Sequence, residues 1–165
     1  MELKNLVSIN GVSGLFQYVG QNKAGIIARQ LGSDRNQYFP SRTNPSAALM
    51  GVTVYTVNNE YGTPLTEVIH TMLKADADGT LAIIDSGSDQ PILREYFFAI
   101  LPMHDPERVS FRDIKKMIKW ATILRDQNLA YLFEPAAPSA AETTNKGEET
   151  SEEENNTEIT TETAE

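Results

Sequence analysis

The sequence predicts an α+β protein: a small SH3-like β-barrel, then a three-helix region, then a disordered acidic tail. Three observations lead to this prediction. Short apolar runs separated by turn residues fill the first 62 residues, helical periodicity replaces them from residue 63, and a Glu-rich segment ends the chain. The expected domains are therefore 1–62, 63–133 and 134–165.

The first 62 residues are typical of short β-strands. Five runs rich in Val, Ile, Phe and Tyr alternate with segments containing Gly, Asn, Asp, Ser or Pro, which favour turns. The runs cover 6–9, 14–19, 25–31, 37–39 and 52–57. Residues 46–51 are expected to form one helical turn before the last strand. Because five short strands bury little as an open sheet, and because closure removes exposed edges, the pattern favours a barrel.

Three amphipathic helices are expected after the strands. The first covers 63–74, with Thr63 as its N-cap, and the second covers 89–102. The third covers 110–127 and begins with S-x-x-D, the pattern of a capping box. Each helix repeats apolar residues at intervals of three and four, so each has one face suited to a shared core.

The net charge of −9 belongs to the tail. Residues 1–133 contain 13 acidic and 13 basic residues, whereas residues 134–165 contain ten Glu and one Lys, and ten minus one accounts for the whole imbalance. Ile159 is the only large aliphatic residue of that segment. Because so little apolar surface cannot offset the entropy of ordering the chain, the tail is predicted to be disordered.

The sequence contains no Cys, which excludes disulfides and thiolate chemistry and fits a reducing cytosol. The first residues lack the basic and long apolar regions of a signal peptide. No apolar run approaches the roughly 20 residues of a membrane helix. We therefore expect a cytoplasmic protein with no membrane partner.

The helix expected at 110–127 carries cations on the face opposite its apolar residues. The candidate binding residues here are Arg108, Arg112, Lys115, Lys116 and Lys119, called the basic stripe below, and the flanking Trp120. Like-charge neighbours three or four positions apart cost about 0.2–0.5 kcal/mol each, which an anionic partner would relieve. Three interpretations are open: a solvated helix face, a surface for an acidic protein segment (including this chain's own tail), or a weak nucleic-acid contact.

Two barrel tyrosines are further candidates. Small barrels use aromatic side chains on one strand face to hold a peptide or a nucleic-acid strand. Most aromatic residues of a 62-residue barrel are needed in its core, but Tyr18 and Tyr38 must also place a hydroxyl. We therefore expect these two to be the likeliest binding residues of the barrel.

Catalytic and metal-binding patterns are not found in the sequence. His70 and His104 are far apart, and neither belongs to a paired ligand motif. We expect His70 to be a partly buried structural residue and His104 to bond locally. No nucleophile, base and orienting group can be assembled, so no catalytic residue, metal or cofactor is expected, and an uncharacterised enzyme is the least favoured class.

The order of these segments resembles a family of short, uncharacterised proteins from Bacteroidetes-type bacteria. The most specific part is L-P-x-x-D-x-x-R-V at 101–109, which runs into D-I-K-K-x-x-x-W at 113–120. The resemblance extends over nearly all of 1–130. It implies a β-rich domain followed by helices and brings no established activity.

These observations favour a non-enzymatic cytoplasmic binding or adaptor protein that acts through protein contacts. The alternative is a weak nucleic-acid- or ribosome-associated factor that uses the basic stripe. The protein interpretation is preferred because a dedicated nucleic-acid binder usually has a basic domain, whereas residues 1–133 carry no net charge.

Overall fold

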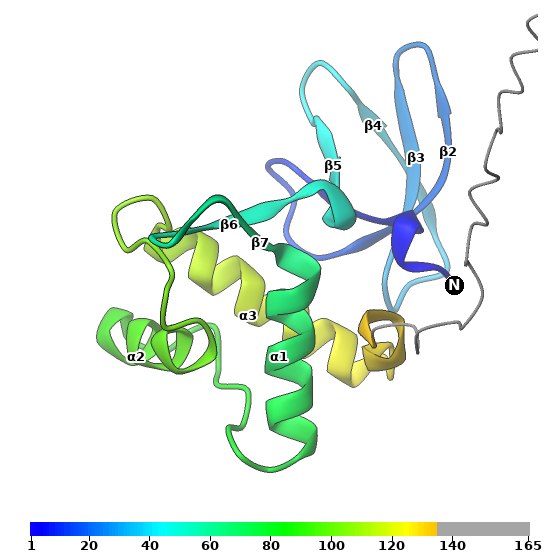
Figure 1. Cartoon of the computed structure of the whole chain (residues 1–165). Helices are drawn as coiled ribbons and strands as arrows, with labels where there is room; N and C mark the ends of the chain where they lie inside the picture. The colour runs from blue at the N-terminus through cyan, green and yellow to red at the C-terminus, as the bar shows by residue number, and fades with distance from the viewer. Residues whose placement is uncertain (135–165) are drawn as a thin grey trace, which may run out of the picture. The chain divides into compact units, whose positions relative to one another are not determined.

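The N-terminal part of the chain folds into a five-stranded antiparallel sheet of order β4-β3-β2-β1-β5 (Figure 1). This computed structural model describes residues 1–134, except for the side chain of Asn59. The strands are β1 Leu6–Ile9, β2 Phe16–Asn22, β3 Gly25–Gln30, β4 Asn36–Pro40 and β5 Ser46–Ala48. The edge strands β4 and β5 are consecutive in the chain, so the turn at 41–45 connects the two edges of the sheet.

A second, two-stranded sheet connects the first sheet to the helices. It pairs β6 (Thr53–Thr56) with β7 (Asn59–Pro64). The loop before the third helix bonds along the other side of β6. The Val57 N–H donates to the Met103 carbonyl oxygen at 2.9 Å, and the Asp105 N–H donates to that of Tyr55 at 2.9 Å. β6 is therefore tied to the loop that leads into the third helix.

Three α-helices follow. They are α1 Leu65–Ala77, α2 Gln90–Ile100 and α3 Phe111–Asp126. The expected capping box of α3 is confirmed: the Asp113 N–H donates to Ser110 Oγ at 3.3 Å, and the Ser110 N–H donates back to the Asp113 carboxylate at 3.3 Å. The predicted Thr63 cap of the first helix is wrong. Thr63 lies in β7 opposite Val54, and Pro64 precedes the helix without a side-chain cap bond.

The segment predicted as one helical turn, 46–51, divides into two elements. Its first half is β5, which pairs with β1, and its second half is the 3-10 helix η2, Leu49–Gly51. Two other short 3-10 helices are η1 Leu3–Asn5 and η3 Ala130–Phe133. The prediction missed β5 because small residues such as Ser and Ala carry little strand signal, while ladder pairing with β1 decides their conformation.

Two buried clusters divide the apolar residues between opposite faces of the first sheet. Along β1, Leu6 belongs to the larger cluster, whereas Val7 and Ile9 belong to the smaller, as alternation across a strand requires. The larger cluster joins Leu6, Leu15, Leu49 and Val54 to the buried faces of α1, α2 and α3. The smaller cluster consists of Val7, Ile9, Phe16, Ile26, Ala28 and Phe39.

The coarse fold prediction is confirmed: the chain is α+β, with an antiparallel five-stranded sheet and three helices. The SH3-like barrel is not confirmed, because neither sheet of the described residues closes. The boundary between 1–62 and 63–133 stays a prediction. The predicted tail lies outside the described residues apart from Glu134, and within residues 1–134 no helix has the length and apolarity needed to cross a membrane.

Candidate functional site

Two adjoining pockets lie between α3 and the strands β1, β5 and β6. Their cavity volumes are about 350 Å³ and about 310 Å³. Ser8, Lys116 and Trp120 line both. The two pockets therefore adjoin at these three residues, and we call them together the Trp120 groove.

Small residues keep the strand side of the first pocket open. Ser8 of β1 and Ala47 of β5 are directly paired in the ladder, so both side chains lie on the face toward α3. The loop 10–14 completes this wall with Gly11 and Gly14. Because none of these side chains is large, the space opposite Trp120 stays unfilled.

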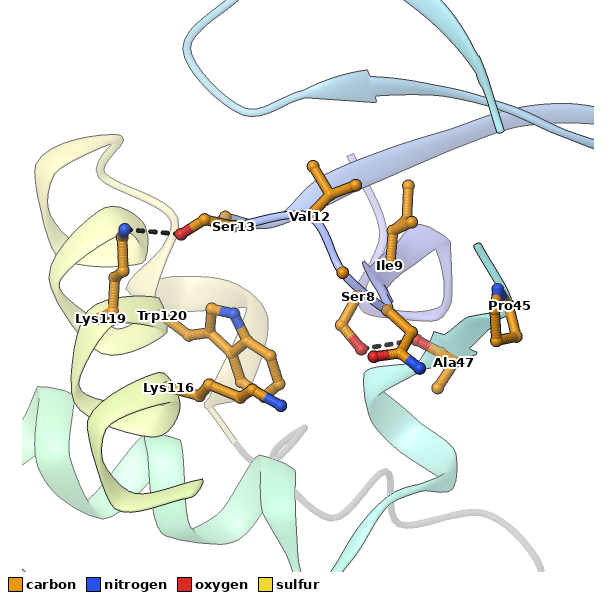
Figure 2. A pocket seen from close by; sticks show the side chains of 12 residues that line it. Ser8, Ile9, Val12, Ser13, Pro45, Ala47, Lys116, Lys119 and Trp120 are labelled. Carbon is orange, nitrogen blue, oxygen red and sulfur yellow. Dashed lines mark hydrogen bonds between the residues drawn. The ribbon is translucent and has the colours of Figure 1, made fainter. Parts of the chain in front are cut away.

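Figure 2 shows the first pocket, with Trp120, Lys116 and Lys119 on the helix side and Ser8, Ser13 and Ala47 across from them. The spacing of α3 explains the grouping, because residues three and four apart lie on one face of a helix.

Lys119 and Lys116 differ in their partners. The Lys119 ammonium donates to Ser13 Oγ at 2.6 Å, which ties α3 to the loop 10–14. Lys116 makes no ion pair or hydrogen bond to any of residues 1–134. One groove cation is therefore held in position and the other is available.

The lining of the second pocket contains more large aliphatic side chains. It includes Val52, Val54, Leu65, Val109 and Met117, together with the charged residues Arg108, Asp113 and the shared Lys116. The Arg108 guanidinium lies over the Tyr55 ring, 5.2 Å from its centroid, and 3.6 Å from an Asp105 carboxylate oxygen. Asp113 is engaged in the capping box of α3. This end of the groove therefore combines aliphatic side chains with the paired Arg108 and the shared Lys116.

The other two cations of the basic stripe lie away from the groove. Arg112 and Lys115 are exposed and line neither pocket. The Lys115 ammonium lies 5.8 Å from the centroid of the Phe111 ring, an exposed contact of small energy. The structure therefore divides the predicted stripe: Arg108, Lys116 and Lys119 border the groove, and Arg112 and Lys115 do not.

Tyr18 and Tyr38 do not share a surface. Tyr18 pairs with Ala28, whereas Tyr38 pairs with Ile27, so their side chains leave the sheet on opposite faces. Tyr18 packs against the smaller cluster. Tyr38 is 47% exposed, and its hydroxyl lies over Gly25, where a Cβ would collide with Tyr38 and with the strand beside it. Neither tyrosine lines the Trp120 groove.

The sequence analysis missed the strand side of the groove. Ser8, Ser13, Ala47 and Tyr55 are all lining or contact residues that it did not single out. Small polar residues carry no chemical signal of their own, so their role depends on a long-range pairing that one sequence does not reveal. Tyr55 lies in the strand expected at 52–57, but it was not named as a candidate.

The two histidines behave as expected. His70 lies in α1 and is partly buried. His104 is buried, with its Nδ1 2.7 Å from the Leu101 carbonyl oxygen and its ring 4.9 Å from that of Phe97. Across residues 1–134, no group of three or more His, Asp or Glu side chains is placed to hold a metal ion.

One perturbed titratable group lies in the helical core. Burial, reinforced by the negative charge of Asp76, raises the pKa of Tyr96 to about 12. The Tyr96 hydroxyl is buried and has no hydrogen-bond partner among the described residues. It lines neither pocket of the groove, so we assign it to stability rather than to binding.

Comparison with known proteins identifies similar domains and a similar structure, but none of them has a stated activity. Residues 3–46 match one domain of unknown function, DUF5606, and residues 52–124 match another, DUF6852. A solution NMR structure from Bacteroides vulgatus, from a structural genomics consortium, is 29% identical with a TM-score of 0.58; the match covers 77% of this chain and 88% of that chain. No curated protein matches the sequence. The resemblance to an uncharacterised family is supported at this coarser level.

Proposed function

We propose that this protein is a non-enzymatic binding or adaptor protein that holds a segment of a partner protein in the Trp120 groove. The observation that carries the proposal is that two adjoining pockets share Ser8, Lys116 and Trp120. An aromatic wall, an apolar floor and a cation with no partner among residues 1–134 are features that favour protein binding. The cytoplasm is the proposed location, since a sequence without Cys fits a reducing compartment.

A weak nucleic-acid contact is the second candidate. It is favoured by Trp120, which could stack on a base beside Lys116 and Lys119. It is disfavoured by the apolar lining of the second pocket and by the balanced charge of residues 1–133.

Two finer proposals concern the fold and the family. We retain an SH3-like barrel for 1–62, supported by edge strands that are consecutive in the chain. We also retain a restriction of the family to Bacteroidetes, supported by the Bacteroides vulgatus relative.

The test is affinity capture from a cytoplasmic extract with three full-length baits: wild type, Ala47→Phe and Ala48→Phe. Ala47 lines the first pocket, whereas Ala48 pairs with Val7 and projects from the opposite face of β5, so it is a matched control. Both positions are exposed, so both variants should fold.

A partner that binds in the groove is retained by wild type and Ala48→Phe and is reduced at least about tenfold by Ala47→Phe. Equal capture by all three baits would count against the groove. Capture that disappears after nuclease treatment of the extract would support the nucleic-acid alternative.

A further inference from the structure

We infer that the segment bound in the Trp120 groove is both acidic and apolar: a carboxylate meets Lys116 and Lys119 in the first pocket, and an apolar side chain enters the second. This inference rests on the proposed function and names the chemistry of the partner. Each part follows from a different property of the groove.

The charge of the groove differs from that of the rest of the described chain. Its lining contains three cations, Arg108, Lys116 and Lys119, and one acid, Asp113, whereas 1–133 as a whole is balanced. The Asp113 carboxylate accepts two bonds from Ser110 at Oδ2, and among residues 1–134 it forms no ion pair with Lys116. An anionic segment therefore meets a local positive charge that no described acidic residue neutralises in the first pocket.

Both lysines of the first pocket are available to an acidic segment. They are three residues apart on α3 and both line the pocket, and Figure 2 shows the Lys119 ammonium directed to Ser13 and the Lys116 ammonium directed away from it. Ser13 accepts one hydrogen bond from Lys119, and an ammonium has three donors, so two remain for a ligand. Ser13 is therefore a positioning residue: it holds Lys119 at the mouth of the pocket before a partner arrives.

The second pocket determines the apolar part of the segment. Val52, Met117 and Val109 give it a hydrophobic floor, and Lys116 and Trp120 are the lining residues of α3 that it shares with the first pocket. A phosphate or a nucleic-acid backbone would leave this floor uncovered. A protein segment covers both pockets when an acidic and an apolar side chain lie close together along it, as they do in an extended peptide.

The experiment selects short random peptides from a display library on the full-length protein. Four baits are compared: wild type, Lys116→Glu/Lys119→Glu, Arg112→Glu/Lys115→Glu and Ala47→Phe. Each double variant reverses two exposed charges of α3, but only Lys116→Glu/Lys119→Glu changes residues that line the groove, and it also removes the Lys119 bond to Ser13.

We expect wild type and Arg112→Glu/Lys115→Glu to enrich peptides in which Asp or Glu is close to an apolar residue. We expect Lys116→Glu/Lys119→Glu to lose them or to select Lys and Arg instead. If wild type selects acid-poor peptides, or if Lys116→Glu/Lys119→Glu selects the same peptides as wild type, the inference is overturned. Neither result contradicts binding in the groove. No enrichment at all, or enrichment that survives Ala47→Phe, would overturn the proposed function as well.

One enriched peptide is then titrated while the fluorescence of Trp120, the single tryptophan of the chain, is followed. Lys116→Glu/Lys119→Glu should bind the peptide at least about tenfold more weakly than wild type. The affinity of Arg112→Glu/Lys115→Glu should stay within about twofold of wild type. Inorganic phosphate and a single-stranded oligonucleotide serve as competitors. Displacement by either at a lower concentration than by unlabelled peptide would rule out the protein segment as the preferred occupant.

Discussion

The helical half and the sheet half of the described chain use their aromatic residues differently. In the helical half, Trp120 lines a groove and Tyr96 is 4% exposed. In the sheet half, Tyr18 and Tyr38 lie on opposite faces and border no pocket of the groove. Aromatic residues that are at least partly accessible can therefore differ in whether they line a pocket: Trp120 does, and Tyr18 and Tyr38 line neither pocket of the groove.

The difference comes from the residues that face each ring. Opposite Trp120 the strands present Ser8 and Ala47, which leave a cavity. Under Tyr38 the sheet presents Gly25, and the tyrosine itself covers the space that this glycine leaves. Small residues of the sheet half thus leave a cavity where they face α3 and are closed over by a neighbouring side chain where they lie under Tyr38.

The largest expected effect tests whether the two halves are energetically separate. Phe97 and Phe16 are fully buried in the larger and the smaller cluster, so replacing either with Ala should cost about 3–5 kcal/mol of unfolding free energy. Since Leu6, Leu15 and Leu49 of the N-terminal part pack in the same cluster as the helices, we expect one cooperative transition in both variants. Urea unfolding followed by circular dichroism measures this, and two separate transitions in Phe16→Ala would show independent domains.

The second prediction compares Trp120, which lines the groove, with Tyr38, which does not. Trp120→Ala removes a partly buried ring packed on the larger cluster, so it should cost about 2 kcal/mol of stability and abolish the enrichment of peptides. Tyr38→Ala should cost less than about 1 kcal/mol and leave peptide binding unchanged, because its ring is half exposed and distant from the lining. Thermal unfolding and peptide titration of the two variants test the contrast, and weaker peptide binding by Tyr38→Ala would contradict it.

These comparisons also show which parts of the fold and of the groove the sequence predicts. Helical periodicity placed α2 and α3 within about two residues of their ends, and S-x-x-D identified the cap of α3, because these signals are local. Helical spacing also grouped Lys116, Lys119 and Trp120, and all three line the first pocket; that they bind a partner stays a prediction. The sequence could not show that Arg112 and Lys115 border no groove, because the wall opposite α3 comes from β1 and β5.

The strand register and β7 were not predicted because both depend on pairing between strands. The β1–β5 ladder sets Ser8 beside Ala47, and these residues are nearly 40 positions apart. β7 was missed because Asn, Glu, Gly and Thr give no apolar alternation, although pairing with β6 makes the segment a strand. A shift of one residue in the register of a strand moves its side chains to the opposite face of the sheet. Composition therefore does not predict which of the aromatic residues, such as Tyr18 and Tyr38, share a face.

The third prediction concerns the buried tyrosine. The pKa of Tyr96 is raised from 10.0 to about 12 by burial, so the folded state holds its proton more tightly than the unfolded state. The associated stability is fully present below pH 10 and is lost as pH rises toward 12, on the order of 2 kcal/mol. Tyr96→Phe removes both this titration and an unpaired hydroxyl, so it should be at least as stable as wild type at pH 7 and should lose less stability between pH 9 and pH 12 than wild type. Urea unfolding across that range measures the slope, and an equally steep loss in the variant would assign the alkaline transition to another group.

The smallest expected effect concerns the bond between the two halves at the groove. Ser13→Ala removes the acceptor of Lys119, but both residues are exposed, so the stability loss should stay below about 0.5 kcal/mol. If this bond pre-positions Lys119, peptide affinity should fall about two- to fivefold, and Ser13→Thr, which keeps a hydroxyl, should restore most of it.

The salt dependence of peptide binding distinguishes a positioning role of Ser13 from a loss of the Lys119 charge at the groove. A positioning role leaves the number of charges at the groove unchanged, so Ser13→Ala should retain the wild-type salt slope, whereas Lys119→Met should flatten it. Trp120 fluorescence at several salt concentrations measures both, and a flattened slope in Ser13→Ala would mean that Lys119 no longer reaches the ligand at all.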